Sequence, residues 1–213
     1  IKMINVSTDK AVKPTSVLGI SKRIVEIICQ SYQYRKKTKM NISTVRFGNV
    51  FGSTGSVVNL FLDKINKGEN VNITNKNVER FFMSINEACN LVITASLLKK
   101  KFATYILEMG KPVKIYDLLK KMIKYKQKKD KNFKIKINEI GLYKGEKLSE
   151  ELSITDKVTK TNVNRILAVD EPKYSLHNID VIIKKIKNKI DSKNNIEIIK
   201  DLRKFLSYEI KIK

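Results

Sequence analysis

The sequence predicts an α/β protein with a mostly parallel sheet flanked by helices. Short β-branched segments alternate with longer segments whose apolar residues recur at helical spacing, and polar or glycine-rich loops join them. This alternation is typical of parallel sheets, because a helix returns the chain to the edge where the next strand begins. Hydrophobic residues make up 42% and charged residues 31% of the chain, which is typical of a globular protein with a packed core.

The first 70 residues contain two predicted strands and two predicted helices. The strands are Lys2–Val6 and Ile42–Phe47. A helix is predicted from Ser16 to about Lys36, because its isoleucines and valines recur at helical spacing. A glycine-rich loop, Gly48–Ser56, separates the second strand from a helix predicted over Val57–Asn66.

The rest of the chain continues the alternation. Ser84 and Glu87 have the spacing of a capping box, which predicts that a helix begins there. In order, the later elements are that helix to about Lys99, a strand at Thr104–Glu108, a helix at Val113–Tyr125, a strand at Phe133–Ile137, and helices at Ile179–Ile190 and Ile196–Ile210. No internal repeat is evident.

The chain is strongly basic, with 44 Lys+Arg against 21 Asp+Glu and a formal net charge of +23. Nine lysines lie between Lys120 and Lys136, and we interpret them as a solvated helix face and the loop after it. No Cys/His finger, RNA-recognition signature or aromatic-interleaved basic stripe occurs, so no specific nucleic-acid partner is expected. His177, the only histidine, is predicted to lie on the surface between two elements.

Cysteine usage and hydropathy bear on the compartment. Cys29 and Cys89 lie far apart in apolar helical segments, which is typical of reducing cytosol and argues against a disulfide framework or a metal site. No apolar run reaches the roughly 18 residues that span a bilayer, and no signal peptide is recognisable. The sequence starts at Ile1 directly in a strand, so we expect a fragment of a longer protein.

Polar side chains follow both early strands, at the edge where open parallel sheets bind ligands. Thr8 offers a hydroxyl, Asp9 a carboxyl and Lys10 an ammonium, and Lys22 adds a second ammonium from the following helix. From spacing alone, a simple chain turn with solvated lysines is the preferred explanation.

Five ordered segments resemble one known family. They are Ser7–Arg23, Val45–Ser53, Glu79–Ser84, Glu108–Ile115 and Gly145–Leu152. Together they are similar to extended short-chain dehydrogenase/reductases of the polysaccharide-biosynthesis type, and among these to UDP-N-acetylglucosamine 4,6-dehydratases. The resemblance implies the C-terminal part of a Rossmann-like parallel sheet. It assigns residues 1–70 to the NAD-binding catalytic part and residues 71–213 mainly to a small α/β substrate-binding portion with C-terminal helices, some segments of which return to the Rossmann part.

The resemblance also implies a redox-neutral reaction on a UDP-sugar. C4 of the sugar gives a hydride to NAD (or NADP), water leaves across C5 and C6, and the hydride returns at C6. In this scheme Asp9 protonates the leaving 6-hydroxyl and Lys10 takes the C5 proton. Thr8 orients the C4 hydroxyl, while Lys22 hydrogen-bonds the nicotinamide ribose and helps to deprotonate that hydroxyl.

Binding residues follow from the same resemblance. The implied cofactor contacts are Lys22, Phe47 and Gly48, and the implied substrate contacts are Asn49, Ser56, Val57, Arg80 and Glu146. Without the resemblance, Asn49 would be a loop-capping amide and Arg80 a surface charge. The sequence contains no glycine-rich dinucleotide fingerprint, so we expect that motif to precede Ile1 and the chain alone to bind NAD poorly.

Three positions depart from the family pattern. Leu18 stands four residues before Lys22, where the family usually has tyrosine; Thr54 replaces an arginine, and Tyr143–Lys144 replaces Arg-Pro. Lys144 offers only a point charge in place of a bidentate guanidinium. An apolar residue in the tyrosine slot favours the membrane-anchored branch, in which the full-length protein lies at the cytoplasmic face of the inner membrane. The resemblance also implies a cytoplasmic location and a homo-oligomer.

Two alternatives stay open. The chain could belong to a nucleotide-sugar epimerase of the same family, or to a catalytically silent module that binds sugar nucleotides. Asp9–Lys10 favours dehydration, because an epimerase that acts only at C4 needs no acid at the 6-hydroxyl.

Overall fold

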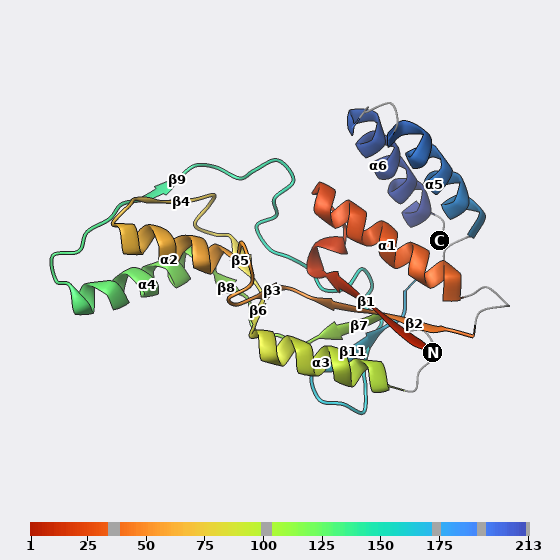
Figure 1. Ribbon diagram of the computed structural model, residues 1–213, viewed down its shortest axis with the longest axis horizontal. Coiled ribbons are helices and arrows are strands. Elements are labelled where there is room, and N and C mark those ends of the chain that lie inside the picture. Colours follow the sequence, from red (N-terminus) through yellow and green to blue (C-terminus); the bar gives the residue numbers. More distant parts are fainter. Residues whose placement is uncertain (34–38, 99–103, 172–175, 191–194, 212–213) are drawn as a thin grey trace.

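The computed structural model describes residues 1–33, 39–98, 104–171, 176–190 and 195–211 of the chain (Figure 1). Its main sheet has five strands in the order β1-β2-β7-β11-β10. Their bounds are Lys2–Thr8, Asn41–Phe47, Thr104–Leu107, Ile166–Val169 and Val158–Lys160. The first three strands are parallel, while β11 and β10 each run antiparallel to their neighbour. The predicted α/β class is confirmed, and the sheet is parallel where the expected site lies.

Helices cover both faces of this sheet (Figure 1). α1 (Val17–Gln33) packs on one face, and α5 (Leu176–Ile190) and α6 (Asn195–Lys211) pack outside it. α3 (Ile85–Leu97) covers the opposite face, and its capping box of Ser84 and Glu87 is present. The core on the α3 side includes Val45, Tyr105 and Leu107.

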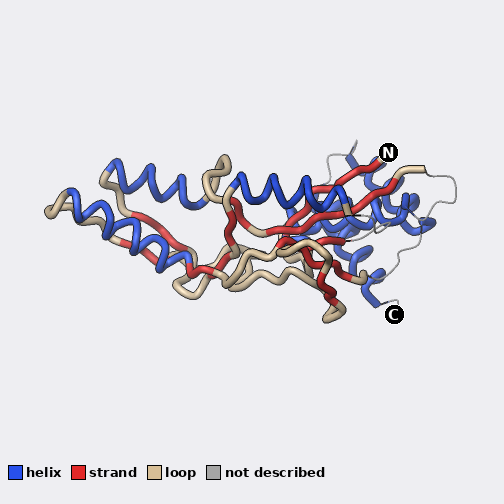
Figure 2. Tube along the Cα trace, turned by 90° about the horizontal axis from the view of Figure 1, so that it is seen from below, coloured by secondary structure: helices blue, strands red, loops and turns tan. Residues whose placement is uncertain are grey.

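A second packed region lies at the end of the elongated molecule that is remote from both termini (Figures 1 and 2). It consists of α2 (Val57–Lys67), α4 (Ile115–Lys129) and the parallel pair of β4 (Val71–Ile73) with β9 (Ile137–Glu139). Its core joins residues on both sides of position 70, and the domain division at that position stays a prediction.

Two short strand pairs connect these regions. β3 (Asn49–Val50) runs parallel to β6 (Phe82–Met83). β5 (Glu79–Arg80) runs antiparallel to β8 (Val113–Lys114). β3 lies within the glycine-rich loop Gly48–Ser56, directly after β2. The chain therefore runs from the main sheet to the second region through the loop that contains several of the predicted site residues.

Several predicted boundaries were wrong. The strand predicted over Phe133–Ile137 begins later than expected: β9 starts only at Ile137, while Phe133 and Ile135 pack into the second core ahead of it. α4 begins at Ile115, because Val113 pairs with Arg80. β1 continues past Val6 to Thr8, and His177 lies in α5 rather than between elements. The helix ends predicted near Lys36 and Lys99 fall outside the described residues.

Two general properties complete the description. Cys29 is buried and Cys89 is exposed, and both are free thiols. Among the described residues, no helix has both the length and the apolar character required to cross a membrane.

Candidate active site

The ends of β1 and β2 lie side by side. Thr8 and Phe47, the last residues of these strands, are paired in the parallel register. A short 3-10 helix, η1 (Asp9–Ala11), follows β1, and the Thr8 hydroxyl caps it by accepting from the Lys10 N–H. Gly48 and Asn49 follow β2. The predicted residues Thr8, Asp9, Lys10, Gly48 and Asn49 are therefore brought together at one edge of the sheet.

Asp9 and Lys10 form the centre of this cluster. Asp9 is 0% exposed, and its Oδ1 accepts from the Thr8 hydroxyl at 2.8 Å and from Lys10 Nζ at 3.0 Å. Lys10 Nζ also donates to Asn49 Oδ1 at 3.1 Å. The Lys10 side chain is 27% exposed, so its ammonium group stands between the buried carboxylate and the outside.

Gly48 gives the Asp9 carboxyl its space. A Cβ at this position would lie 2.9 Å from Asp9 Oδ2 and 2.9 Å from the Cβ of Phe81. Asp9 Oδ2 has no hydrogen-bond partner among the described residues. The Gly48 N–H donates to Met109 Sδ at 3.0 Å, which fixes the loop from its other side. The glycine is required for close packing rather than for a positive φ.

Lys22 lies apart from the Asp9–Lys10 pair. Its Nζ donates to the carbonyl of Val6, in β1, at 3.3 Å. One turn earlier on α1, Leu18 is 54% exposed, and Val6 is also exposed. α1 approaches η1 very closely at Gly19, where a Cβ would lie 2.2 Å from the Lys10 carbonyl oxygen. The start of α1, which carries Lys22, is thus packed tightly against Lys10.

A cavity of about 360 Å³ opens next to Lys10. The residues that line it include Lys10, Thr15, Arg80, Tyr143, Lys144 and Glu146. Two of them, Arg80 and Glu146, are predicted nucleotide contacts, and Lys10 is a predicted catalytic group. A predicted catalytic residue and two predicted nucleotide-binding residues therefore line the same cavity. Tyr143 and Lys144, which replace the family's Arg-Pro, line it as well.

Arg80 and Glu146 are paired with each other. Arg80 is 7% exposed, so it is not a surface charge, and its Nη2 lies 3.2 Å from Glu146 Oε1. The same oxygen accepts from the Thr74 hydroxyl at 3.0 Å, and Glu146 Oε2 accepts from the Tyr143 N–H at 3.2 Å. Glu146 therefore holds together the arginine and the loop that form the cavity wall.

The segment 143–151 is fastened across the loop that follows η1. Lys147 Nζ donates to the Val12 carbonyl at 2.7 Å, and the Thr15 hydroxyl donates to the Gly145 carbonyl at 2.7 Å. Gly145 has φ +84, and a Cβ there would lie 2.6 Å from the Thr15 carbonyl oxygen. The sequence analysis missed these contacts. The only signal was the glycine at a turn, since the partners are about 130 residues apart.

The remaining predicted residues have local structural roles. Ser56 is the N-cap of α2 and its hydroxyl accepts from the Asn59 N–H at 3.3 Å. Val57 is the first residue of α2 and packs against the second core. Phe47 packs against the core of the main sheet. None of these three residues is among those that line the cavity beside Lys10.

Behind the site lies a buried ionic cluster, which we call the charge quartet: Arg23, Glu26, Arg46 and Glu171. Glu26 accepts from Arg46 Nε at 2.8 Å, from Arg46 Nη2 at 2.7 Å and from Arg23 Nη1 at 2.8 Å. Glu171 pairs with Arg46 at 2.7 Å and with Arg23 at 2.9 Å. Burial raises the pKa of the Glu26 carboxyl, but Arg46 and Arg23 outweigh it and hold the pKa below its ordinary value.

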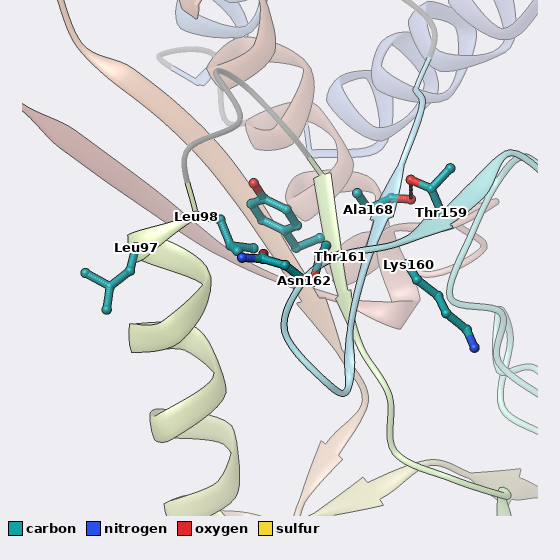
Figure 3. A pocket seen from close by; sticks show the side chains of 8 residues that line it. Leu97, Leu98, Thr159, Lys160, Thr161, Asn162 and Ala168 are labelled. Atoms are coloured by element: carbon teal, nitrogen blue, oxygen red, sulfur yellow. Dashed lines mark hydrogen bonds between the residues drawn. The ribbon is translucent and has the colours of Figure 1, made fainter.

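A second cavity, of about 470 Å³, lies elsewhere on the main sheet (Figure 3). Leu97 and Leu98 bound it from the end of α3, and Thr161 and Asn162 bound it from the connection between β10 and β11. It adjoins the start of β7, where Tyr105 lies, whereas ligands of parallel sheets bind beyond the strands' carboxyl ends. None of the predicted site residues lines it.

The model of one protein family, described as polysaccharide biosynthesis protein, matches residues 1–171. The chain belongs to this family. One relative, the capsular polysaccharide biosynthesis protein CapD of Staphylococcus aureus, is 37% identical over 198 residues, or 92% of this chain and 33% of CapD.

Two solved structures illustrate the similarity of fold. Pen from Bacillus thuringiensis is 34% identical with a TM-score of 0.73, over 80% of this chain and 53% of Pen. A UDP-glucuronic acid 4-epimerase from Bacillus cereus, in complex with UDP-glucuronic acid and NAD, shares the fold at 18% identity and a TM-score of 0.58, over 72% of this chain and 52% of the epimerase. The chain thus spans a third to a half of these proteins.

Proposed function

We propose that the full-length protein is an NAD-dependent 4,6-dehydratase that converts a UDP-N-acetylhexosamine into its 4-keto-6-deoxy derivative for polysaccharide synthesis. The observation that carries the proposal is the hydrogen-bonded row of Asp9, Lys10 and Asn49, whose central residue, Lys10, lines a cavity that Arg80 also lines. When the Lys10 ammonium passes a proton to the Asp9 carboxylate, the resulting carboxyl and amine are the acid and the base that removal of water across C5 and C6 requires.

Lys10 is the group that meets the substrate in this proposal. Its ammonium is partly exposed and lines the cavity, so its neutral form can take the C5 proton. Asp9 supplies a proton to the leaving 6-hydroxyl, and Thr8 orients the C4 hydroxyl. Asp9 has no exposed surface, so its carboxyl does not reach the substrate in this arrangement. Either η1 shifts to bring the carboxyl to the 6-hydroxyl, or the proton passes from Asp9 through Thr8 or Lys10.

The residues around Lys22 fit one end of a nicotinamide cofactor. An ammonium group that already reaches the end of β1 is suited to ribose hydroxyls, and the exposed side chains of Val6 and Leu18 are suited to an apolar ring face. When bound, the nicotinamide would accept a hydride from C4 and return it at C6. Lys22 would hold the ribose and favour loss of the C4 hydroxyl proton through its positive charge.

The cavity wall supports binding of a nucleoside diphosphate. Arg80 offers a guanidinium that Glu146 holds in place, Glu146 is itself fixed by the Thr74 hydroxyl, and Lys144 adds an exposed positive charge. Asn49 fixes the Lys10 ammonium, and we propose that its amide also contacts the sugar. Ser56 and Val57 stay proposed contacts at the start of α2, and Phe47 and Gly48 stay proposed cofactor contacts. The homo-oligomeric state and the membrane anchor also stay predictions.

Epimerisation at C4 is the second candidate, favoured by the fold shared with a UDP-sugar 4-epimerase. Mass spectrometry of the product separates the two reactions. The full-length protein should convert UDP-N-acetylglucosamine into a product that is lighter by one water, with no net consumption of NAD. A product of unchanged mass that is a galacto isomer would replace dehydration by epimerisation, and binding without any product would indicate a silent module.

A further inference from the structure

Positive charge is concentrated in one part of the chain. Residues 120–136 contain nine lysines against one acidic residue, a net charge of +8 out of the +23 of the whole protein. These residues form the second half of α4 and the segment that leads to β9. In Figures 1 and 2 this part lies at the end of the molecule farthest from the termini.

α4 turns a lysine-rich face to the outside, which we call the basic face: Lys121, Lys124 and Lys128. All three side chains are exposed, while Ile115 and Leu119 on the other side of the helix are buried in the second core. The three lysines are spaced three and four residues apart and so lie on one face. Like charges at this spacing destabilise a helix, so the basic face carries a cost that an anionic partner would remove.

Acidic neighbours do not neutralise the basic face. Some lysines on other helices are paired, as Lys67 is with Asp63 and Lys189 is with Asp201. Within the described part of the chain, no ion pair is recorded for Lys121, Lys124 or Lys128. The ion pair seen on α4 lies in its first half, between Lys120 and Asp117 at 3.7 Å.

We propose that the basic face of α4 binds the surface of an anionic lipid bilayer. Residues 114–136 contain ten lysines and no arginine, and compact ammonium groups suit a field of lipid phosphates better than the bidentate readout of nucleic acid. Tyr125 lies beside these lysines and is 63% exposed, with the Lys129 ammonium 4.9 Å from its ring centroid. An exposed tyrosine among lysines is typical of side chains at a membrane interface.

The position of the basic face is compatible with catalysis on the membrane. The cavity beside Lys10 is lined by segments 10–16, 80 and 143–150, none of which belongs to α4. A bilayer bound to α4 would therefore leave the proposed active site open. This inference does not depend on the proposed reaction, because it rests only on charge and exposure.

The test is sedimentation of the purified protein with lipid vesicles at low and high salt. One set of vesicles contains phosphatidylcholine alone, and the other contains phosphatidylcholine with phosphatidylglycerol. The test variant carries Lys121→Glu, Lys124→Glu and Lys128→Glu. The matched control carries Lys184→Glu, Lys185→Glu and Lys187→Glu, which are exposed lysines of α5 with the same total change of charge. A Lys→Gln version of the test variant and a thermal melt of each protein exclude loss of folding.

The proposal predicts binding to the anionic vesicles only, and weaker binding as salt rises. Reversal of the basic face should weaken this binding by more than about a hundredfold, since each lysine near an anionic surface contributes appreciably, while the α5 control keeps most of it. Equal losses in both variants would show a general effect of net charge and overturn the proposal. Absence of vesicle binding, or tighter binding to duplex DNA than to the vesicles, would also overturn it.

Discussion

Removal of one negative charge from the charge quartet should strongly destabilise the protein. Glu26→Gln removes one of the two carboxylates that pair with Arg23 and Arg46 in the quartet, in a site where no member is more than 4% exposed in its side chain. Breaking a buried ion pair from one side costs about 3–5 kcal/mol, because the remaining charge stays desolvated and uncompensated. The free energy of unfolding, measured by urea denaturation at neutral pH, should fall by this amount.

The pH dependence gives a second readout of the same variant. The pKa of Glu26 is held below its ordinary value in the folded protein, mainly by Arg46 against the opposing effect of burial. Its contribution to stability is therefore present above the ordinary carboxyl pKa and is lost as pH falls through the lowered value. The stability difference between wild type and Glu26→Gln should shrink in acid, because glutamine cannot titrate.

Glu151→Gln is the matched control for this experiment. Glu151 forms an exposed pair with Lys13 at 2.6 Å, and exposed pairs contribute at most about 1 kcal/mol. The control should unfold close to wild type at every pH. A Glu26→Gln variant that is as stable as the control would refute the claim that the quartet is a compensated, desolvated unit.

Three further outcomes follow from the site. Gly48→Ala should destabilise the protein by about 1–3 kcal/mol and lower turnover, because the new methyl group collides with Asp9 Oδ2 and Phe81. Urea denaturation and a product assay measure the two effects, and a variant that is as stable and as active as wild type contradicts the prediction. Arg80→Lys should raise the KM for UDP-N-acetylglucosamine with little change in kcat, since it removes a held guanidinium; a loss confined to kcat would argue against nucleotide binding. Leu18→Tyr in the full-length enzyme should change the rate and pH profile moderately, and activity that appears only in this variant would indicate a silent wild-type chain.

The parallel strands β1, β2 and β7 and the edge at the ends of β1 and β2 could be predicted because their signals are local, whereas the antiparallel strands β10 and β11 were not predicted. The β-branched runs of β1, β2 and β7 and the capping box of α3 are short-range patterns with a direct physical cause. The meeting of Asp9, Lys10 and Asn49 follows from the rule that the carboxyl ends of parallel strands share one edge. The registers confirm that this edge exists, with Thr8 opposite Phe47.

The rest depends on contacts that leave no local pattern. β3, β5, β6 and β8 contain two residues each, which is too short for any alternation to be recognised. Arg46 lies in a strand where charge suggests exposure, yet it is buried because Glu26 and Glu171 come to it from other elements. Lys147 bonds to Val12 across 135 positions of sequence. The partners of these residues are far away in the sequence and come close only when the chain has folded.

The most direct test of the central claim is the reaction of the full-length protein with UDP-N-acetylglucosamine in D₂O, followed by mass spectrometry and NMR. If Lys10 removes the C5 proton during dehydration, the product is lighter by one water, apart from the added deuterium, and carries deuterium at C5. Lys10→Ala should lower this turnover by about 10²–10⁴-fold. A product that retains its 6-hydroxyl and carries no deuterium at C5, or wild-type turnover in Lys10→Ala, would contradict the assignment of this cluster as the dehydration site.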